Sequence, residues 1–352
     1  MLKVLMCGNH PQNKGGMTSV INQIKAYDWK KENIKIIFIP TYKPGKMITK
    51  MVFFGYSYLK ILWQMIINKP DIVHMHMSYK GSFVRKYYIH ILCKIFGVKD
   101  IIHLHGSEFE KWYYSSNEYK KKKIRKLLEE VSCVIVLGEE WKKVIRKITP
   151  EARIETISNG IRIPSKTVSW RKDKCEVLFL GVLILRKGVT DLLKAISLLY
   201  KKNKIGNMHF TIAGTGSEEE RLKYECRKLN IEKVVTFVGW VDGEKKKYYL
   251  ENSQIMVSPS YNEGLPISIL EAISYGMPVV STDVGDISHV VRNNKNGILV
   301  KPGDIDGLAE ALLNVSKEEN FMNMSKMSKK IAEEDYNLDH FYCKLKNIYF
   351  KL

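Results

Sequence analysis

The chain has 352 residues, too many for one typical core and enough for two domains that each bury an interior. Its six cysteines are scattered without a C-x-x-C pair, which argues against a disulfide framework or a zinc ribbon and fits a reducing cytosol. The net charge of +20 is concentrated in residues 1–165, which carry +16, whereas residues 166–352 carry +4. This charge predicts an anionic partner, either nucleic acid or an anionic membrane surface.

The chain begins with an apolar run, "LKVLMCG", that is too short for the core of a signal peptide and is followed at once by turn residues. We therefore expect a strand and a protein of the cytosol. The next segment, "NKGGMTSVINQI", places Gly15 and Gly16 before a helix. It lacks the G-K-[ST] ending of a phosphate-binding P-loop, which disfavours an ATPase.

Short apolar, β-branched runs recur along the whole chain with helix-length segments between them. This alternation predicts an α/β protein with two doubly wound, Rossmann-like domains, each a parallel sheet covered by helices on both faces. The expected strands are 3–8, 34–40, 71–77, 100–106, 132–138, 153–158, 176–181, 208–214, 234–239, 254–260, 278–282 and 296–300.

The domain boundary is predicted in a segment without sustained periodicity, 159–174, which contains Pro164 and reads as a linker. The expected domains are therefore 1–165 and 166–335. A final helix over 336–352 is expected to cross back to the first domain. Ligands of open α/β sheets bind at the carboxyl ends of the strands, so the functional motifs should directly follow strands.

Two segments of the basic half, 47–70 and 82–99, mix aromatic and aliphatic residues with spaced lysines, a pattern typical of helices that lie at a bilayer surface. Residues 51–68 have Lys60 as their one charge, so a membrane span is an alternative there. The segment stands between two expected parallel strands, however, and that position requires a crossover helix. We favour a crossover helix with an exposed interfacial face.

Four histidines, His74, His76, His103 and His105, stand near the ends of two expected strands. Four histidines on two strands could ligate zinc, although no carboxylate or cysteine stands beside them at ligand spacing. The period of two places His103 and His105 on the same face of their strand, so periodicity does not choose between them.

The stretch "VLILRKGVTDLLKAI" follows a strand in the second half and places Arg186 and Lys187 before a helix. Two cations beside a helix N-terminus favour an anion site suited to a diphosphate, because free N–H groups and the helix dipole add to the charges. The alternative is a basic, solvated turn, and these residues alone do not decide between the two.

The stretch "YNEGLPISILEA" carries two glutamates seven residues apart, Glu263 in a loop and Glu271 on the helix that begins near Pro266. Gly264 allows close backbone approach, and each carboxylate can accept hydrogen bonds from pairs of hydroxyls. Recognition of a polyol is the use this arrangement favours. Two solvated surface glutamates are the alternative, which the spacing alone does not exclude.

The segment "NEGLPISILEAISYGMPVVSTDVGDISHVV", with "FLGVLILRKG" before it and "NGILVKPGD" after it, resembles the donor-binding domain of retaining nucleotide-sugar glycosyltransferases of group 1, family 4. The resemblance implies the GT-B fold, with two Rossmann-like domains facing across a cleft. By this resemblance Arg186 and Lys187 hold the donor diphosphate, and Glu271 accepts from the ribose hydroxyls. Glu263, with the amides of Gly264 and Leu265, contacts the transferred sugar.

The N-terminal half resembles the acceptor domain of the same family more loosely. By that resemblance Gly15 and Gly16 admit the donor close to the backbone, and His105 is the active-site histidine. The family implies a site without metal or other cofactor, in which cations and a helix dipole neutralise the leaving diphosphate. It also implies retention at the anomeric carbon. Glu263 orients the sugar, and a double-displacement route stays open.

Two other functions compete with this interpretation. A sugar-nucleotide epimerase of the same architecture would bind the donor without an acceptor, but the two-glutamate signature argues against it. A nucleic-acid binder is suggested by "KKKKIRK" at 120–126, although such a run is commonly the solvated face of a helix and no nucleic-acid module accompanies it. Attachment to an anionic membrane explains the basic half better.

Family members with this profile extend lipid-linked surface polysaccharides in bacteria. The expected partners are therefore a nucleotide-sugar donor, a glycan or lipid-linked acceptor and an anionic membrane, without nucleic acid. We expect the enzyme at the inner face of the cell membrane, and the sequence leaves the donor sugar open.

Overall fold

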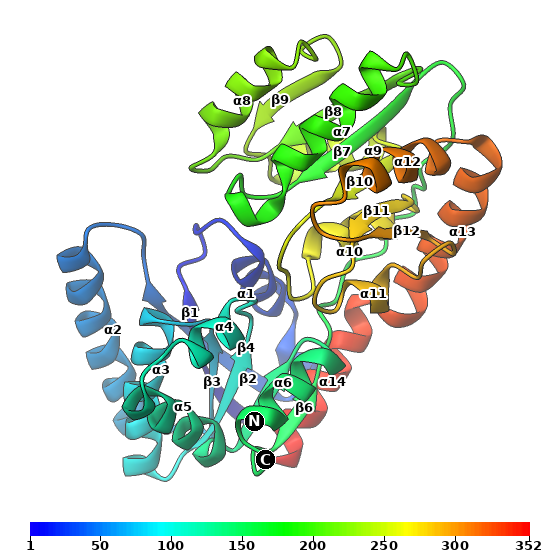
Figure 1. Ribbon diagram of the computed structural model, residues 1–352. Helices are drawn as coiled ribbons and strands as arrows, with labels where there is room; N and C mark the ends of the chain where they lie inside the picture. The colour runs from blue at the N-terminus through cyan, green and yellow to red at the C-terminus, as the bar shows by residue number, and fades with distance from the viewer. The chain divides into compact units, whose positions relative to one another are not determined.

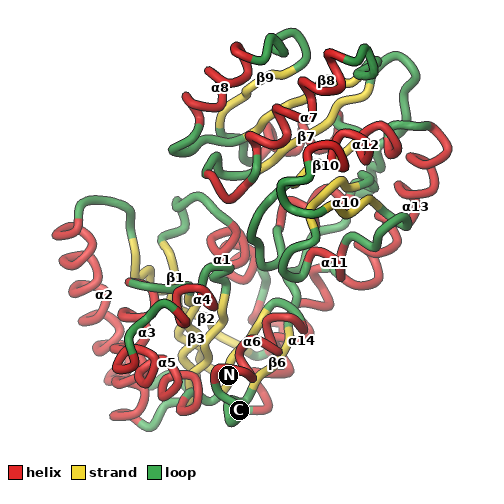
Figure 2. Tube along the Cα trace, in the orientation of Figure 1, coloured by secondary structure: helices red, strands yellow, loops and turns green.

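The computed structural model describes all residues from 1 to 352 and divides the chain into two compact units (Figure 1). Unit 1 comprises residues 1–158 and 341–352, and unit 2 comprises residues 159–340. Each unit holds its own six-stranded sheet. In Figure 2 strands are yellow and helices red, and helices lie on both sides of each sheet.

The sheet of unit 1 is parallel throughout and has the order β2-β1-β3-β4-β5-β6. Its central strands are buried on both faces, as expected of a sheet covered by crossover helices. The order reverses between β1 and β3, which makes a switch point where ligands of such sheets bind. Its strands are β1 (Leu2–Asn9), β2 (Ile34–Tyr42), β3 (Ile72–Met77), β4 (Lys99–Leu104), β5 (Cys133–Val136) and β6 (Ile154–Thr156).

One face of this sheet packs on α2, α3 and α5, through apolar side chains such as Ile61, Ile89 and Leu127. The other face carries α1 and α14, where Ile21 lies against Gly8 and Tyr349 bonds to His74. The helices of unit 1 are α1 (Gly16–Ala26), η1 (Trp29–Glu32), α2 (Met47–Ile67), α3 (Gly81–Phe96), α4 (Phe109–Tyr114), α5 (Glu118–Glu130), α6 (Glu139–Ile148) and α14 (Leu338–Lys351), the last belonging to unit 1 from Phe341 onward.

The sheet of unit 2 is also parallel, with the order β12-β11-β10-β7-β8-β9. Its switch point lies between the neighbouring strands β7 and β10. The strands are β7 (Cys175–Leu180), β8 (Met208–Ala213), β9 (Val235–Gly239), β10 (Ile255–Ser258), β11 (Val279–Thr282) and β12 (Gly297–Val300). The helices are η2 (Leu185–Lys187), α7 (Val189–Lys201), α8 (Glu219–Lys228), α9 (Gly243–Asn252), α10 (Ile267–Ser274), α11 (Ile287–Val290), α12 (Ile305–Val315) and α13 (Glu318–Asp335).

All twelve predicted strands are present, each within a few residues of its expected bounds. The ambiguous segment 47–70 forms α2, the crossover helix between β2 and β3. No helix of the structure combines the length and the apolarity that a membrane span needs. The basic run 120–126 lies on α5, which buries Ile124, the one apolar residue of the run, together with Leu127 and Leu128.

The segment expected to be a linker, 159–174, differs from that expectation because it packs along unit 2. Ile161 bridges to Asn337, the Val168 N–H donates to the Tyr275 carbonyl, and the Trp170 indole donates to the Ser316 carbonyl. The division between the units falls at residue 158. The segment forms no helix or strand of its own, but these contacts hold it against unit 2, so it is not a free tether.

Candidate functional site

The loop after β7 carries the two cations that the sequence singled out. Arg186 and Lys187 form the end of η2, and Gly188 joins it to α7 with a φ of 66°. A Cβ at Gly188 would stand 1.8 Å from the carbonyl oxygen of Pro259. Only glycine therefore lets this loop pack against the segment that follows β10, the neighbouring strand at the switch point.

Both cations converge on the carboxylate of Glu263, which is 7% exposed. Lys187 Nζ donates to Glu263 Oε1, and Arg186 Nη1 lies 3.4 Å from Oε2. The hydroxyl of Ser260 donates to Oε1 at 2.9 Å, and Arg186 also donates to the carbonyl of Asn262 at 2.7 Å. The cluster holds two cations and one anion, so it keeps an excess positive charge at the carboxyl edge of the sheet.

Burial opposes ionisation of Glu263, but the charges of Lys187 and Arg186 and the hydrogen bonds from Lys187 and Ser260 outweigh it and lower the pKa of this carboxyl below its usual range. Glu263 is therefore a carboxylate at neutral pH. Such a buried, charged group can accept hydrogen bonds but is unsuited to act as a general acid.

The loop between Glu263 and α10 presents backbone donors. Neither the Gly264 nor the Leu265 N–H donates a hydrogen bond to the protein, and both residues precede the first turn of α10. Two contacts fix the backbone of this loop. Asn159 donates a hydrogen bond to the Leu265 carbonyl, and Gly285 packs so closely on the Glu263 carbonyl that a Cβ there would stand 2.1 Å from the oxygen. Free amides at a helix N-terminus can bind anionic or hydroxyl oxygens.

Glu271 lies on α10, and its side chain is largely buried. Its Oε1 accepts a hydrogen bond from Lys246 Nζ of α9. The second glutamate of the motif is thus a charged acceptor held by a cation, as Glu263 is, but by a different lysine. The two glutamates do not share a partner.

In unit 1, Gly15 caps α1 with φ 126° and ψ 166°, a backbone conformation that side-chain-bearing residues rarely adopt. A Cβ on Gly15 would meet no atom within 4 Å, and Gly16 is exposed. The loop after β1 therefore leaves open space over its glycines, as close approach of a ligand to the backbone requires.

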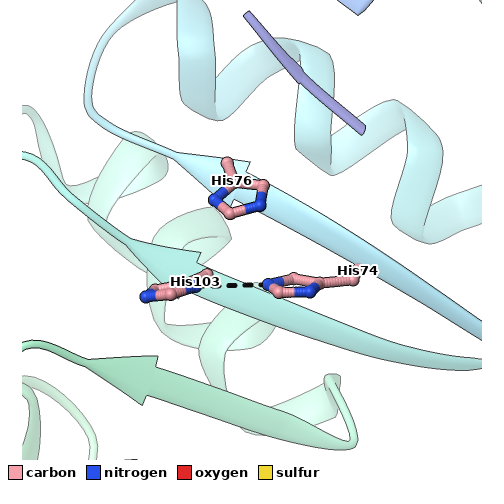
Figure 3. A group of neighbouring side chains, drawn as sticks. All are labelled: His74, His76 and His103. Carbon is pink, nitrogen blue, oxygen red and sulfur yellow. Dashed lines mark hydrogen bonds between the residues drawn. The ribbon is translucent and has the colours of Figure 1, made fainter. Parts of the chain in front are cut away.

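Four histidines of unit 1, His74, His76, His103 and His105, form one array of packed rings toward the carboxyl ends of β3 and β4. Figure 3 shows three of them, His74, His76 and His103. His74 Nε2 lies 3.3 Å from His103 Nδ1, and His76 Nδ1 lies 2.9 Å from His105 Nε2. His74 Nδ1 also lies 2.6 Å from the hydroxyl of Tyr349. All four rings share the face that packs on α1 and α14, as the period of two predicts.

Burial keeps this array neutral. It lowers the pKa of His74 and of His105 to about 3, and burial together with the neighbouring imidazoles lowers the pKa of His76 and His103 well below 6.5. His105 is the partly exposed member, whereas the other three are fully buried. A ligand at the strand ends would therefore meet His105 first.

Three of the histidines, His74, His76 and His103, each place one ring nitrogen within 4.8 Å of the others, a spacing that could hold a metal ion. His76 Nε2 and His103 Nε2 are buried without a hydrogen-bond partner. The metal-free site implied by the resemblance stays a prediction.

Two models of glycosyltransferase families match this chain. The family described as Glycosyl transferases group 1 matches residues 163–336, and Glycosyltransferase Family 4 matches residues 25–163. The chain belongs to the retaining glycosyltransferases of group 1, family 4. The family decides between the transferase and the epimerase that the sequence left as competitors.

Relatives and solved structures agree with this family. The glycosyltransferase is 26% identical over 346 residues to the UDP-Gal:alpha-D-GlcNAc-diphosphoundecaprenol alpha-1,3-galactosyltransferase of Escherichia coli, with 92% of this chain and 86% of the relative covered. It is 27% identical to the amylovoran biosynthesis glycosyltransferase AmsK of Erwinia amylovora, covering 88% and 76%. The sucrose-phosphate synthase of Thermosynechococcus elongatus superposes with a TM-score of 0.85 at 18% identity, covering 100% and 99%, and shows the GT-B fold.

The structure of the glycosyltransferase brings Arg186, Lys187 and Glu263 into one cluster beside Gly264 and Leu265, and it places Glu271 on the helix that follows. Gly15, Gly16 and His105 lie in unit 1. The individual roles of these residues stay predictions.

Sequence reasoning missed three residues. Lys246 holds Glu271, but it stands within three successive lysines that look like a solvated run. Ser260 bonds to Glu263, and its place directly after a strand was an available signal. Lys86 belongs to the segment 82–99, which the sequence pattern assigned to a bilayer surface, yet it is fully buried because α3 turns it toward the sheet.

Proposed function

We propose that this glycosyltransferase moves a hexose from a UDP-sugar to a glycan carried on a lipid diphosphate, at an anionic membrane surface, in the synthesis of a bacterial surface polysaccharide. The proposal of a UDP-sugar donor rests on the buried Glu263 cluster at the switch point of unit 2. The acceptor class rests on the diphosphoundecaprenol substrate named for the Escherichia coli relative and on the amylovoran role named for AmsK.

The donor diphosphate would bind to Arg186 and Lys187, whose charges exceed that of Glu263 by one. In the proposed complex these cations stabilise the charge that grows on the leaving diphosphate, so that no metal ion is required. Glu263 keeps the cations in place and accepts from hydroxyls of the sugar. The free N–H groups of Gly264 and Leu265 donate to the sugar or its phosphate.

Glu271 would accept hydrogen bonds from the two ribose hydroxyls, because a carboxylate offers two oxygens at the spacing of a diol. Lys246 holds this carboxylate charged and oriented. In unit 1, His105 is the proposed acceptor-side residue. Its neutral imidazole can accept a hydrogen bond from a hydroxyl or donate one to an oxygen, and burial keeps it from carrying a charge.

Membrane attachment is proposed for the outer face of α2. This face exposes an apolar stripe along the whole helix, and α2 contains lysines but no acidic residue. We call this the α2 stripe; its members are Met47, Ile48, Met51, Val52, Tyr56, Leu59, Trp63, Ile66 and Ile67. Apolar burial and attraction to anionic lipid would act on the same helix.

The test of the donor half is UDP affinity measured by calorimetry. Arg186→Ala or Glu271→Ala removes charge-assisted hydrogen bonds worth roughly 1.5–3 kcal/mol, so each should weaken UDP binding about ten- to a hundredfold. Lys194→Ala, at an exposed position of α7, is the matched control and should bind as the parent does. A panel of UDP-sugars in a thermal-shift assay would then identify the donor, since ligands of the folded state raise the melting temperature.

If Arg186→Ala and Glu271→Ala both bound UDP with the affinity of the parent, the assignment of the donor site would be wrong. Transfer from the selected donor to a prenyl-diphosphate-linked sugar tests the acceptor half. Turnover on a free oligosaccharide but none on the lipid-linked sugar would contradict it.

A further inference from the structure

Six cations gather around the ends of β2 and β3 and the first turns of α2 and α3, on or beside loops at the carboxyl edge of the sheet of unit 1. None of them forms an ion pair. Between Glu32 and Glu108 the chain holds two acidic residues, Asp71 and Asp100, and both stand at the amino ends of strands. The six are Lys43, Lys46, Lys50, Lys80, Arg85 and Lys86.

The aromatic ring of Tyr42, at the end of β2, contacts two of these cations. The guanidinium carbon of Arg85 lies 4.8 Å from the ring centroid, and Lys50 Nζ lies 5.8 Å from it. Arg85 Nε is buried without an acceptor. A guanidinium that stacks on an aromatic face keeps its N–H donors available for an anion, which it can bind through two parallel hydrogen bonds.

Lys86 follows Arg85 on α3 and is fully buried. Its Nζ donates to Thr41 Oγ1 at 2.8 Å, and that hydroxyl donates in turn to the Gly8 carbonyl at 3.1 Å. No carboxylate compensates this ammonium, and burial, with Arg85, lowers its pKa to about 7. A buried cation without a counter-ion is costly, so an anion bound at the strand ends would stabilise it.

The α2 stripe begins at the same place. Met47, Ile48 and Met51, its first members, flank Lys50 on the first turns of α2 and are each at least 66% exposed. An apolar track that starts beside unpaired cations is complementary to a molecule with an anionic head and a long apolar tail. A phosphate without a tail would leave the stripe unused, and a neutral lipid would leave the cations unused.

We propose that Lys50 and Arg85, which lie over Tyr42, and Lys86, which is buried beside Thr41, bind the diphosphate of a polyprenyl-diphosphate-linked acceptor, whose prenyl chain runs along the α2 stripe. This inference rests on the proposed function, because it assigns a place to the acceptor of that reaction. Lys50 and Arg85 contact the diphosphate, and Lys86 lies beneath them as the buried charge that the diphosphate compensates.

The test is calorimetric binding of farnesyl diphosphate to the full chain. Farnesol lacks the anionic head and inorganic pyrophosphate lacks the tail, so each should bind at least tenfold more weakly than farnesyl diphosphate. Arg85→Gln should weaken farnesyl diphosphate binding at least tenfold and leave farnesol binding unchanged. Lys50→Gln, on the exposed side of the cluster, provides a second variant if Arg85→Gln fails to fold. Lys99→Gln, an exposed lysine at the amino end of β4, is the matched control and should have no effect.

UDP and farnesyl diphosphate affinities, both measured on two variants, distinguish this subsite from the donor site. Arg186→Ala should lose UDP affinity and keep farnesyl diphosphate affinity, whereas Arg85→Gln should do the reverse. Loss of UDP binding by the parent would overturn the proposed donor site and leave this subsite standing. The subsite is overturned if the parent fails to bind farnesyl diphosphate, or if Arg85→Gln and Lys50→Gln bind it as the parent does. It is also overturned if both variants lose affinity for phosphatidylglycerol vesicles by the same factor, because the cluster would then be a general anionic-surface site.

Discussion

The two units share one architecture but carry their charges in opposite ways. In unit 2 Arg186 and Lys187, at the carboxyl edge of the sheet, are paired with a buried carboxylate, Glu263. In unit 1 the cations around Tyr42, Lys50 and Arg85, have no acidic partner. The titratable groups at the centre of the unit 1 edge are histidines that burial keeps neutral. The paired cluster is ordered before any ligand binds, whereas the unpaired cations are compensated only by an anion from outside.

The largest expected difference between the units is their response to acid. In the unfolded chain His74, His76 and His103 take up protons near pH 6.5, but in the folded core their lowered pKa keeps them neutral. Their contribution to stability is present above pH 6.5 and is lost as the pH falls below it, by about 4 kcal/mol per pH unit at most for the three groups. Hydrogen exchange between pH 7.5 and 5.5 should therefore show unit 1 opening before unit 2.

His90 of unit 1 acts in the other direction. Burial opposes its protonation, but Asp100 and Glu130 outweigh burial and raise its pKa, so it stabilises below pH 6.5 and this contribution is lost as the pH rises through the raised value. The stability that His90 adds in acid does not offset the stability that His74, His76 and His103 lose. Simultaneous opening of both units in acid, or earlier opening of unit 2, would refute this contrast.

A substitution in the paired cluster should separate binding from catalysis. Glu263→Gln keeps an acceptor for the Ser260 hydroxyl but removes the carboxylate charge that orients the cations and the sugar. We expect turnover to fall about a hundredfold, the scale of losing one charge-stabilising group in an active site. UDP affinity should not fall, because Arg186 and Lys187 are released from their internal partner.

Steady-state kinetics and calorimetry on the same preparation measure both effects. Glu220→Gln, at an exposed position of α8, is the control. Parental turnover in Glu263→Gln, or a loss of UDP affinity as large as that of Arg186→Ala, would show that pairing with Glu263 does not position the cations for catalysis.

A smaller effect is expected at the membrane. Lys46→Gln with Lys60→Gln removes two exposed cations beside the α2 stripe, each contributing about 1 kcal/mol near an anionic surface, so affinity for phosphatidylglycerol vesicles should fall at least tenfold. Added salt should weaken parental binding because these charges are screened. Lys194→Gln with Lys201→Gln in unit 2 should leave vesicle sedimentation unchanged. Equal binding of the parent to neutral and anionic vesicles would argue against the surface attachment.

The smallest expected effect is that of chelation. If the diphosphate is neutralised by Arg186, Lys187 and backbone N–H groups, exhaustive treatment with EDTA should leave the transfer rate unchanged. Loss of activity that a divalent metal restores would make His74, His76 and His103 a ligand set and give unit 1 a catalytic role of a different kind.

The strands and the donor motif could be predicted from sequence because the residues of each one lie close together along the chain. Each strand is a contiguous apolar run, and Glu263, Gly264, Leu265 and Glu271 lie within nine residues of one another. The convergence of Arg186 and Glu263, 77 residues apart, follows from the strand order, which places β7 beside β10. A resemblance to a known family supplied their roles.

The site in unit 1 was less predictable for physical reasons. Tyr42, Lys50 and Arg85 come from three elements, and nothing in the spacing shows that they meet. The burial of Lys86 depends on the rotation of α3 against the sheet, which a mixed apolar and basic sequence does not determine. Lys246 shows the same limit in unit 2, because its neighbours Lys245 and Lys247 have the same composition and only one of the three faces Glu271.

Hydrogen–deuterium exchange of the full chain with UDP, and separately with farnesyl diphosphate, tests the central division of labour most directly. We predict that UDP slows exchange in residues 183–189 and 260–271 of unit 2 and leaves 40–52 and 80–88 unaffected. Farnesyl diphosphate should slow exchange in 40–52 and 80–88 and leave the unit 2 segments unaffected. Protection of residues 40–52 by UDP, or of 260–271 by farnesyl diphosphate, would contradict the assignment of donor and acceptor to separate charge clusters.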